Sequence, residues 1–126
     1  MKSSFILIAL VTIFSTSLLS VHAADDKQAQ DIIDKLLAAQ LAQNYDAFVA
    51  DGNDQFKAAL SKTQFDAASK VVNTLTKGGY SETFFGELNQ GGYQVFLYRL
   101  RLKNGGDDLL STMYLKDDKV AAIHFH

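Results

Sequence analysis

Cysteine and proline are both absent from this 126-residue sequence. Without cysteine the chain has no disulfide, no thiolate nucleophile, no cysteine-ligated metal and no cysteine to carry a lipid anchor. Without proline there is no Pro-rich linker, and no internal repeat or low-complexity segment is visible. We therefore expect one domain that is held together by the packing of its own core.

Clusters of basic residues are absent as well. The chain has 12 Lys and Arg against 14 Asp and Glu, which gives a formal net charge of −2. Proteins that bind a phosphate backbone carry clustered Lys and Arg. We therefore expect no nucleic-acid partner.

The N-terminus has the pattern of a secretory signal peptide over residues 1–23. Lys2 gives a short positive region, the run FILIALVTIFSTSLL carries no charge, and Val21-His22-Ala23 suits a cleavage site. The apolar run is short for a membrane span, which takes about 20 residues. The alternative is an uncleaved membrane anchor. We expect cleavage near Ala23, a periplasmic or secreted location, no stable membrane anchor, and a single domain over 24–126.

The first half of this domain follows a helical period. Apolar residues recur three and four positions apart, and the first stripe ends at Leu41. Ser61 and Gln64 have the spacing of a capping box, which opens the last helix. The expected helices cover 29–41, 45–49 and 61–77, with a further short turn over 54–60.

After Gly79 the apolar period changes to two, which is typical of strands. The expected strands are Tyr80–Leu88, Tyr93–Leu102, Asp107–Leu115 and Lys119–His126. Short turns join them, so they should form an antiparallel meander. Helices followed by such a meander make an α+β fold, with the helices packed on one face of a curved four-stranded sheet.

Turn chemistry predicts how the strands pair. Asn104-Gly105 and Asp117-Asp118 favour two-residue turns, and a four-residue loop is expected over 89–92. The resulting pairs are Phe96 with Met113, Arg101 with Asp108, Glu82 with Arg99, Phe85 with Phe96, Leu115 with Val120, and Ser111 with His124.

This register predicts two different faces of the sheet. The more apolar face, which should pack on the helices, carries Phe85, Phe96, Leu100, Leu102, Leu109, Met113, Leu115, Val120 and Ala122. The other face carries Arg99 and Arg101 with Val95, Leu97, Leu110, Ile123 and Phe125. The two arginines suit either an anion site or ordinary cross-strand ion pairs, and we favour the ion pairs.

One polar row crosses the apolar face, made by Thr83, Tyr98, Ser111 and His124. A few polar groups within an apolar wall are typical of a small-ligand site. The alternatives are that these groups bond to one another or meet water. We predict these four as the ligand-binding residues.

The sequence offers no complete catalytic or metal-binding set. His124 and His126 share a strand face, but no third ligand accompanies them. Ser111 facing His124 lacks an orienting acid, and no aspartate falls beside Tyr98 to take a proton. We therefore predict no catalytic residue, no metal and no cofactor.

The segments NYDAF, AALSKTQF and DDKVAAI, in this order of elements, resemble the nuclear-transport-factor-2-like superfamily. The resemblance covers nearly the whole domain after Ala23 and is greatest to small exported bacterial members of unknown function. It implies a cone-shaped domain with a pocket at its wide end, and a homodimer. The superfamily includes ketosteroid isomerase, polyketide cyclases, dehydratases and non-catalytic binding domains. No acidic residue here matches the aspartate of the isomerase.

These observations lead to one expected function and two alternatives. We expect an exported domain, without assembled catalytic residues, that binds a small apolar ligand or an envelope protein. The first alternative is an isomerase- or dehydratase-type enzyme that uses Tyr98 and His124. The second is a periplasmic inhibitor or immunity-type protein, which would act through its surface.

Overall fold

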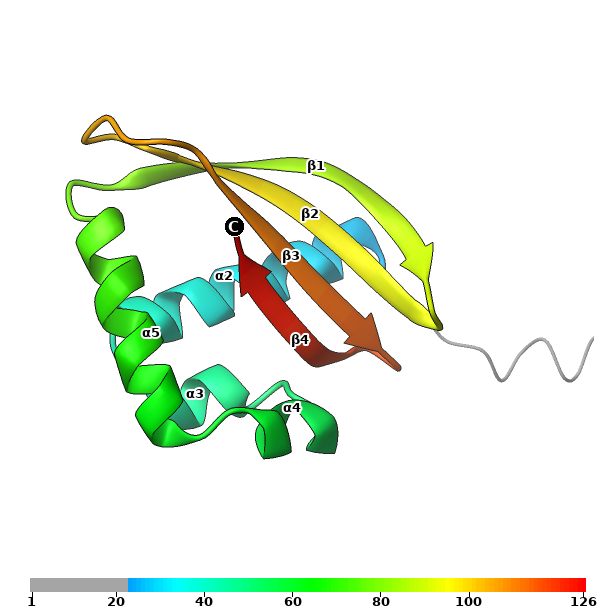
Figure 1. Ribbon diagram of the computed structural model, residues 1–126. Helices are drawn as coiled ribbons and strands as arrows, with labels where there is room; N and C mark the ends of the chain where they lie inside the picture. Colours follow the sequence, from blue (N-terminus) through cyan, green and yellow to red (C-terminus); the bar gives the residue numbers. More distant parts are fainter. Residues whose placement is uncertain (1–22) are drawn as a thin grey trace, which may run out of the picture.

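The computed structural model describes residues 23–126, so nearly all of the predicted signal peptide lies outside the described residues. The elements are α2 (Asp26–Leu41), α3 (Tyr45–Val49), α4 (Asp54–Ala59), α5 (Lys62–Leu75), β1 (Tyr80–Gln90), β2 (Tyr93–Leu102), β3 (Leu109–Lys116) and β4 (Lys119–Phe125). The strands form one antiparallel sheet in the order β1-β2-β3-β4, with the helices on one side of it (Figure 1). The predicted α+β arrangement of helices followed by an antiparallel meander is confirmed. None of the helices in this part of the chain is long and apolar enough to span a membrane.

The helices begin where a side chain can cap them. Asp25, Asn44 and Asn53 accept hydrogen bonds from the first turns of α2, α3 and α4. At α5 the predicted capping box is present. The N–H of Gln64 donates to Ser61 Oγ at 3.1 Å, and the N–H of Ser61 donates to Gln64 Oε1 at 3.0 Å. A side-chain cap therefore fixes the first residue of each of these four helices.

The core lies between α2 and the face of the sheet that we call the inner face. The inner face is formed by Phe96, Tyr98, Leu100, Met113, Leu115 and Val120, all of them almost fully buried. The apolar stripe of α2 packs against it, with one departure from prediction. Gln40 is only 3% exposed whereas Leu41 is 41% exposed, so the stripe ends in a buried amide rather than in a leucine.

The central pair of strands has the predicted register. Phe96 lies opposite Met113, and the Arg101 guanidinium lies 3.4 Å from the Asp108 carboxylate. Arg99 Nε lies 4.0 Å from the same carboxylate. Arg101 therefore has the predicted carboxylate partner, whereas Arg99 shares the carboxylate of Asp108 instead of pairing with Glu82.

The register of β1 differs from the prediction because the turn after β1 is shorter than expected and because a bulge lies between Phe84 and Gly86. Arg99 lies opposite Thr83 rather than Glu82, and Phe96 lies opposite Glu87 rather than Phe85. Both predicted pairs are wrong, since the turn after β1 is shorter than expected and Gln90 already pairs with Tyr93.

The bulge also changes which phenylalanine faces the core. The Phe84 ring lies 5.4 Å from the Tyr98 ring, whereas Phe85 is 58% exposed under the guanidinium of Arg99. One extra residue in a strand sends the following side chains to the opposite face. The prediction that Phe85 packs against the helices is therefore wrong.

A second bulge, in β4, makes the predicted faces of the end of this strand wrong. Leu115 lies opposite Val120 as predicted, but Tyr114 then lies opposite Ala122, which leaves Ala121 as the extra residue. Beyond it Ser111 lies opposite Phe125, so the predicted Ser111–His124 pair is wrong. The bulge places Ile123 and Phe125 on the inner face, and it places Ala122 and His124 on the outer face.

Candidate functional site

The four predicted site residues do not form one row. Tyr98 and Ser111 lie opposite each other on the inner face and are fully buried. Thr83 lies on the outer face, where its hydroxyl accepts a 3.4 Å hydrogen bond from Arg99. His124 is exposed and also lies on the outer face, opposite Thr112. The bulges in the two edge strands turn the side chains of Thr83 and His124 to the outer face, away from Tyr98 and Ser111.

Tyr98 sits in a setting that keeps its phenol neutral. Burial raises the pKa of Tyr98 above its usual value, and the negative charges of Glu82, Asp26 and Asp34 raise it further. The hydroxyl has no hydrogen-bond partner within residues 23–126. Tyr98 and His124 lie on opposite faces of the sheet, so they do not form the common site that the enzyme alternative requires.

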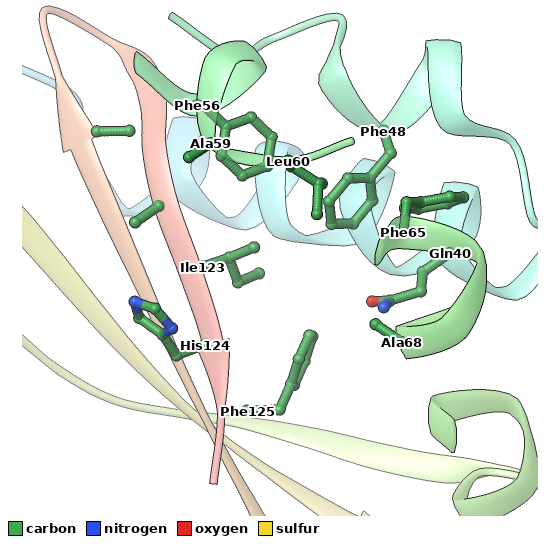
Figure 2. A pocket seen from close by; sticks show the side chains of 12 residues that line it. Gln40, Phe48, Phe56, Ala59, Leu60, Phe65, Ala68, Ile123, His124 and Phe125 are labelled. Carbon is green, nitrogen blue, oxygen red and sulfur yellow. The ribbon is translucent and has the colours of Figure 1, made fainter. Parts of the chain in front are cut away.

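An apolar cavity of about 240 Å³ lies between β4 and the helices. Phe48, Phe56 and Phe65 line it from the helical side, and Ile123 and Phe125 line it from β4 (Figure 2). The His124 ring lies at its margin, on the other side of the strand from Ile123 and Phe125 (Figure 2). Of the four residues predicted from the sequence, His124 alone contributes to this cavity.

Local structure explains both walls of the cavity. On the β4 side, the bulge at Ala121 turns Ile123 and Phe125 inward. On the helical side, the Phe48 ring lies 4.9 Å from the Phe65 ring and 5.7 Å from the Phe56 ring. Aromatic contacts of this kind join α3, α4 and α5 into one wall. The cavity is therefore built by side-chain packing between these helices and β4.

Gln40 provides a polar group within this apolar lining. Its Oε1 atom is buried and has no hydrogen-bond partner in the described part of the chain. Figure 2 shows the amide pointing into the space between α5 and β4. A buried acceptor without a partner costs about 1–3 kcal/mol. A ligand with an N–H or O–H group would remove this cost.

Gln40 was not among the residues predicted from the sequence, although a signal for it exists. It follows Leu37 by three positions and Leu36 by four, which places it on the buried stripe of α2. A polar residue at a core position of an amphipathic helix is the informative exception. The cavity could not be found in the same way, because it depends on a bulge.

No metal-binding group of three or more His, Asp or Glu side chains comes together within residues 23–126. The rings of His124 and His126 lie 6.1 Å apart at the end of β4. Both belong to the exposed end of the strand rather than to the cavity interior.

No protein-family model matches the chain, and no curated protein is similar to it in sequence. Among solved structures it is similar to an uncharacterized cystatin-fold protein from Novosphingobium aromaticivorans, with 13% identity and a TM-score of 0.42. The match covers 76% of this chain and 95% of that chain. Membership of the nuclear-transport-factor-2-like superfamily therefore stays a prediction.

Proposed function

We propose that this chain is a binding domain that takes a small apolar ligand with a hydrogen-bond donor into the cavity beside β4. The observation that carries the proposal is the unpartnered Oε1 of Gln40 in an otherwise apolar cavity. Ligand sites combine apolar lining with a few polar groups that orient the ligand. In this proposal the phenyl rings supply most of the affinity, and Gln40 selects ligands with a donor.

The proposal includes no catalytic step. The buried hydroxyls of Tyr98 and Ser111 belong to the core and do not line the cavity. We further propose, from the sequence pattern of residues 1–23, that the domain acts after export. We also propose that the domain forms a homodimer, and the mass of the purified protein in solution tests this.

A matched pair of small probes tests the selection by Gln40. Indole carries an N–H donor, and 1-methylindole has nearly the same rings without it. We expect indole to bind with a Kd on the order of 1 mM, in line with a weak fragment. One neutral hydrogen bond is worth about 1 kcal/mol, so indole should bind about five-fold more tightly than 1-methylindole. Chemical-shift changes in NMR spectra of the protein measure both affinities.

Two pairs of variants make the test specific. Ala68 and Ala67 are both exposed on α5, but only Ala68 lines the cavity. Ala68→Leu should abolish indole binding, whereas Ala67→Leu should not. Gln40→Leu should stabilise the free protein by about 1 kcal/mol and remove the preference for indole. Tyr98→Phe also removes a buried unpartnered oxygen, but it should leave that preference intact.

The proposal fails if neither probe shifts the resonances of residues that line the cavity. It also fails if Ala68→Leu binds indole as well as the unchanged protein does. A preference for indole that persists in Gln40→Leu would show that another group supplies the acceptor.

A further inference from the structure

β4 is an edge strand, and part of its main chain faces away from the sheet. Leu110 and His126 exchange two main-chain hydrogen bonds, of 3.0 and 2.9 Å. Bonded and non-bonded positions alternate along an antiparallel pair, so His124 also bonds to β3. The N–H and C=O groups of Ile123 and Phe125 therefore point away from β3, toward the open edge.

These outward-facing groups have no protein partner in the part of the chain that the structure describes. No hydrogen bond outside the β3–β4 pairing involves the main chain of Ile123 or Phe125 there. Unpaired N–H and C=O groups along a strand edge are a template for another extended chain.

The same edge of β4 is already paired at Val120, where it bonds to the segment 51–53. The N–H of Val120 donates to the carbonyl of Asp51 at 2.9 Å, and the N–H of Asn53 donates to the carbonyl of Val120 at 2.8 Å. Gly52 and Val120 thereby form a parallel bridge. Beyond the bulge, Ile123 and Phe125 continue this outward-facing edge, so an extended chain there would prolong a pairing that the fold itself begins.

The cavity lies directly beside these open main-chain groups. The side chains of Ile123 and Phe125 line it, and Phe65 and Ala68 of α5 lie across from them (Figure 2). A strand added to β4 would lie about 4.8 Å from it, on the side of the cavity. Because side chains of a strand alternate between faces, every second residue of the added chain would point toward the helices.

We propose that β4 binds an extended peptide as an added fifth strand, with one large apolar side chain of the peptide inserted into the cavity. The proposal rests on the proposed function, because the peptide side chain occupies the same cavity as the small ligand. Main-chain hydrogen bonds to Ile123 and Phe125 would hold peptides of many sequences, and the cavity would select for the apolar residue. The Gly52–Val120 bridge already occupies the edge before the bulge, so the open edge is a short stretch, which also limits edge-to-edge aggregation.

Amide hydrogen exchange measured by NMR tests the added strand directly. The probe is a capped pentapeptide of threonine with phenylalanine at its centre. At saturating peptide we expect exchange of the Ile123 and Phe125 amides to slow by about ten-fold or more, as they gain partners. The amide of His124, which is already bonded to β3, should change little. Indole alone should not slow Ile123 and Phe125, because it fills the cavity without pairing with the edge.

Two N-methylated isomers of the peptide test which main-chain groups pair. One isomer is methylated at the central residue, and the other is methylated at the two residues that flank it. N–H groups of successive residues point to opposite sides of a strand. One isomer should therefore lose about ten-fold or more in affinity while the other binds within about two-fold of the parent peptide.

The outcomes separate this inference from the proposed function. If indole binds and the peptide neither binds nor protects the edge amides, the inference is wrong and the small-ligand proposal stands. If neither probe binds, both proposals are wrong. If the edge amides become protected without peptide, in proportion to protein concentration, a second copy of the chain is the partner and the peptide assignment is overturned. Equal affinity of both N-methylated isomers also overturns it.

Discussion

Gln40, Tyr98 and Ser111 are buried side chains that each have a polar atom without a hydrogen-bond partner in the described residues. Their surroundings differ. Tyr98 and Ser111 lie opposite each other in the core and do not line the cavity, whereas Gln40 does. Of these three, the unpaired oxygen of Gln40 is therefore the one with which a ligand in the cavity can pair.

The half-buried carboxyl group of Glu82 affects how the stability of the protein depends on pH. Gln30 Nε2 donates to the Glu82 carboxylate and, at 3.1 Å, to Asp34 Oδ1. Burial raises the pKa of Glu82 above 4.5, and the charge of Asp34 raises it further, while the hydrogen bond from Gln30 lowers it. The net effect is that the folded protein holds the Glu82 proton more tightly than the unfolded chain does.

We therefore predict that Glu82→Gln stabilises the protein at pH 7 but not at pH 4. Because the pKa of Glu82 is higher in the folded state, protonation of Glu82 contributes to the stability of the fold. This contribution is fully present below the unfolded-state pKa and is lost as pH rises through the folded-state pKa. The gain should be below about 1 kcal/mol, because the carboxyl is only half-buried and water screens it. Urea denaturation at both pH values measures it. An equal effect at pH 4 and pH 7 would contradict the argument.

At the scale of elements, the two bulges decide which side chains meet. Each lies in an edge strand, where one extra residue is tolerated because only one neighbouring strand must adjust. Gly86 at the first bulge has φ +156°, which a residue with a side chain rarely adopts. The second bulge contains Ala121 and turns the side chains of Ile123 and Phe125 toward the helices.

Gly86→Ala should destabilise the protein by about 1–2 kcal/mol, because the bulge requires a backbone conformation that glycine adopts more easily. The matched control is Gly106→Ala. A Cβ at position 106 meets only Leu102, at an ordinary contact distance of 3.6 Å. That control should change stability by less than about 0.5 kcal/mol. Urea midpoints measure both. If the two variants were equally stable, the bulge would not depend on glycine.

The bulges also mark how far the sequence could predict the structure. Hydrophobic period and caps were sufficient for the helices and for the exact bounds of β2, and the Asn104-Gly105 turn was sufficient for the pairing of Phe96 with Met113. Nothing in the apolar pattern of β4 indicates an extra residue at Ala121, because apolar and polar residues alternate on either side of it. The predicted polar row therefore contained two correct partners, Tyr98 and Ser111, and two residues on the wrong face.

At the scale of the whole molecule, one side chain ties the start of the domain to the sheet. The N–H of Ala24 donates to Gln94 Oε1 at 2.9 Å, and Gln94 Nε2 donates to the carbonyl of Ala24 at 2.9 Å. The same Nε2 donates to Glu87 at 3.0 Å. Ala24 is 5% exposed and belongs to the core. If the signal peptide is cleaved after Ala23, as we propose, the new α-amino group is the group that Gln94 holds.

Gln94→Ala should therefore destabilise the domain by about 1–2 kcal/mol, because two hydrogen bonds to Ala24 are lost and its buried main chain is left unpaired. We expect the loss in a chain that begins at Ala24, where the amino terminus must be held without a preceding segment. Gln90→Ala is the matched control, since Gln90 is exposed at the end of β1 and should change stability little. Urea denaturation gives the free energies, and hydrogen exchange of the first turn of α2 shows where the loss occurs. A global loss with no faster exchange at the start of α2 would show that Gln94 acts through the sheet instead. An N-terminal sequence that begins elsewhere than Ala24 would contradict the predicted cleavage site while leaving the role of Gln94 in the fold unchanged.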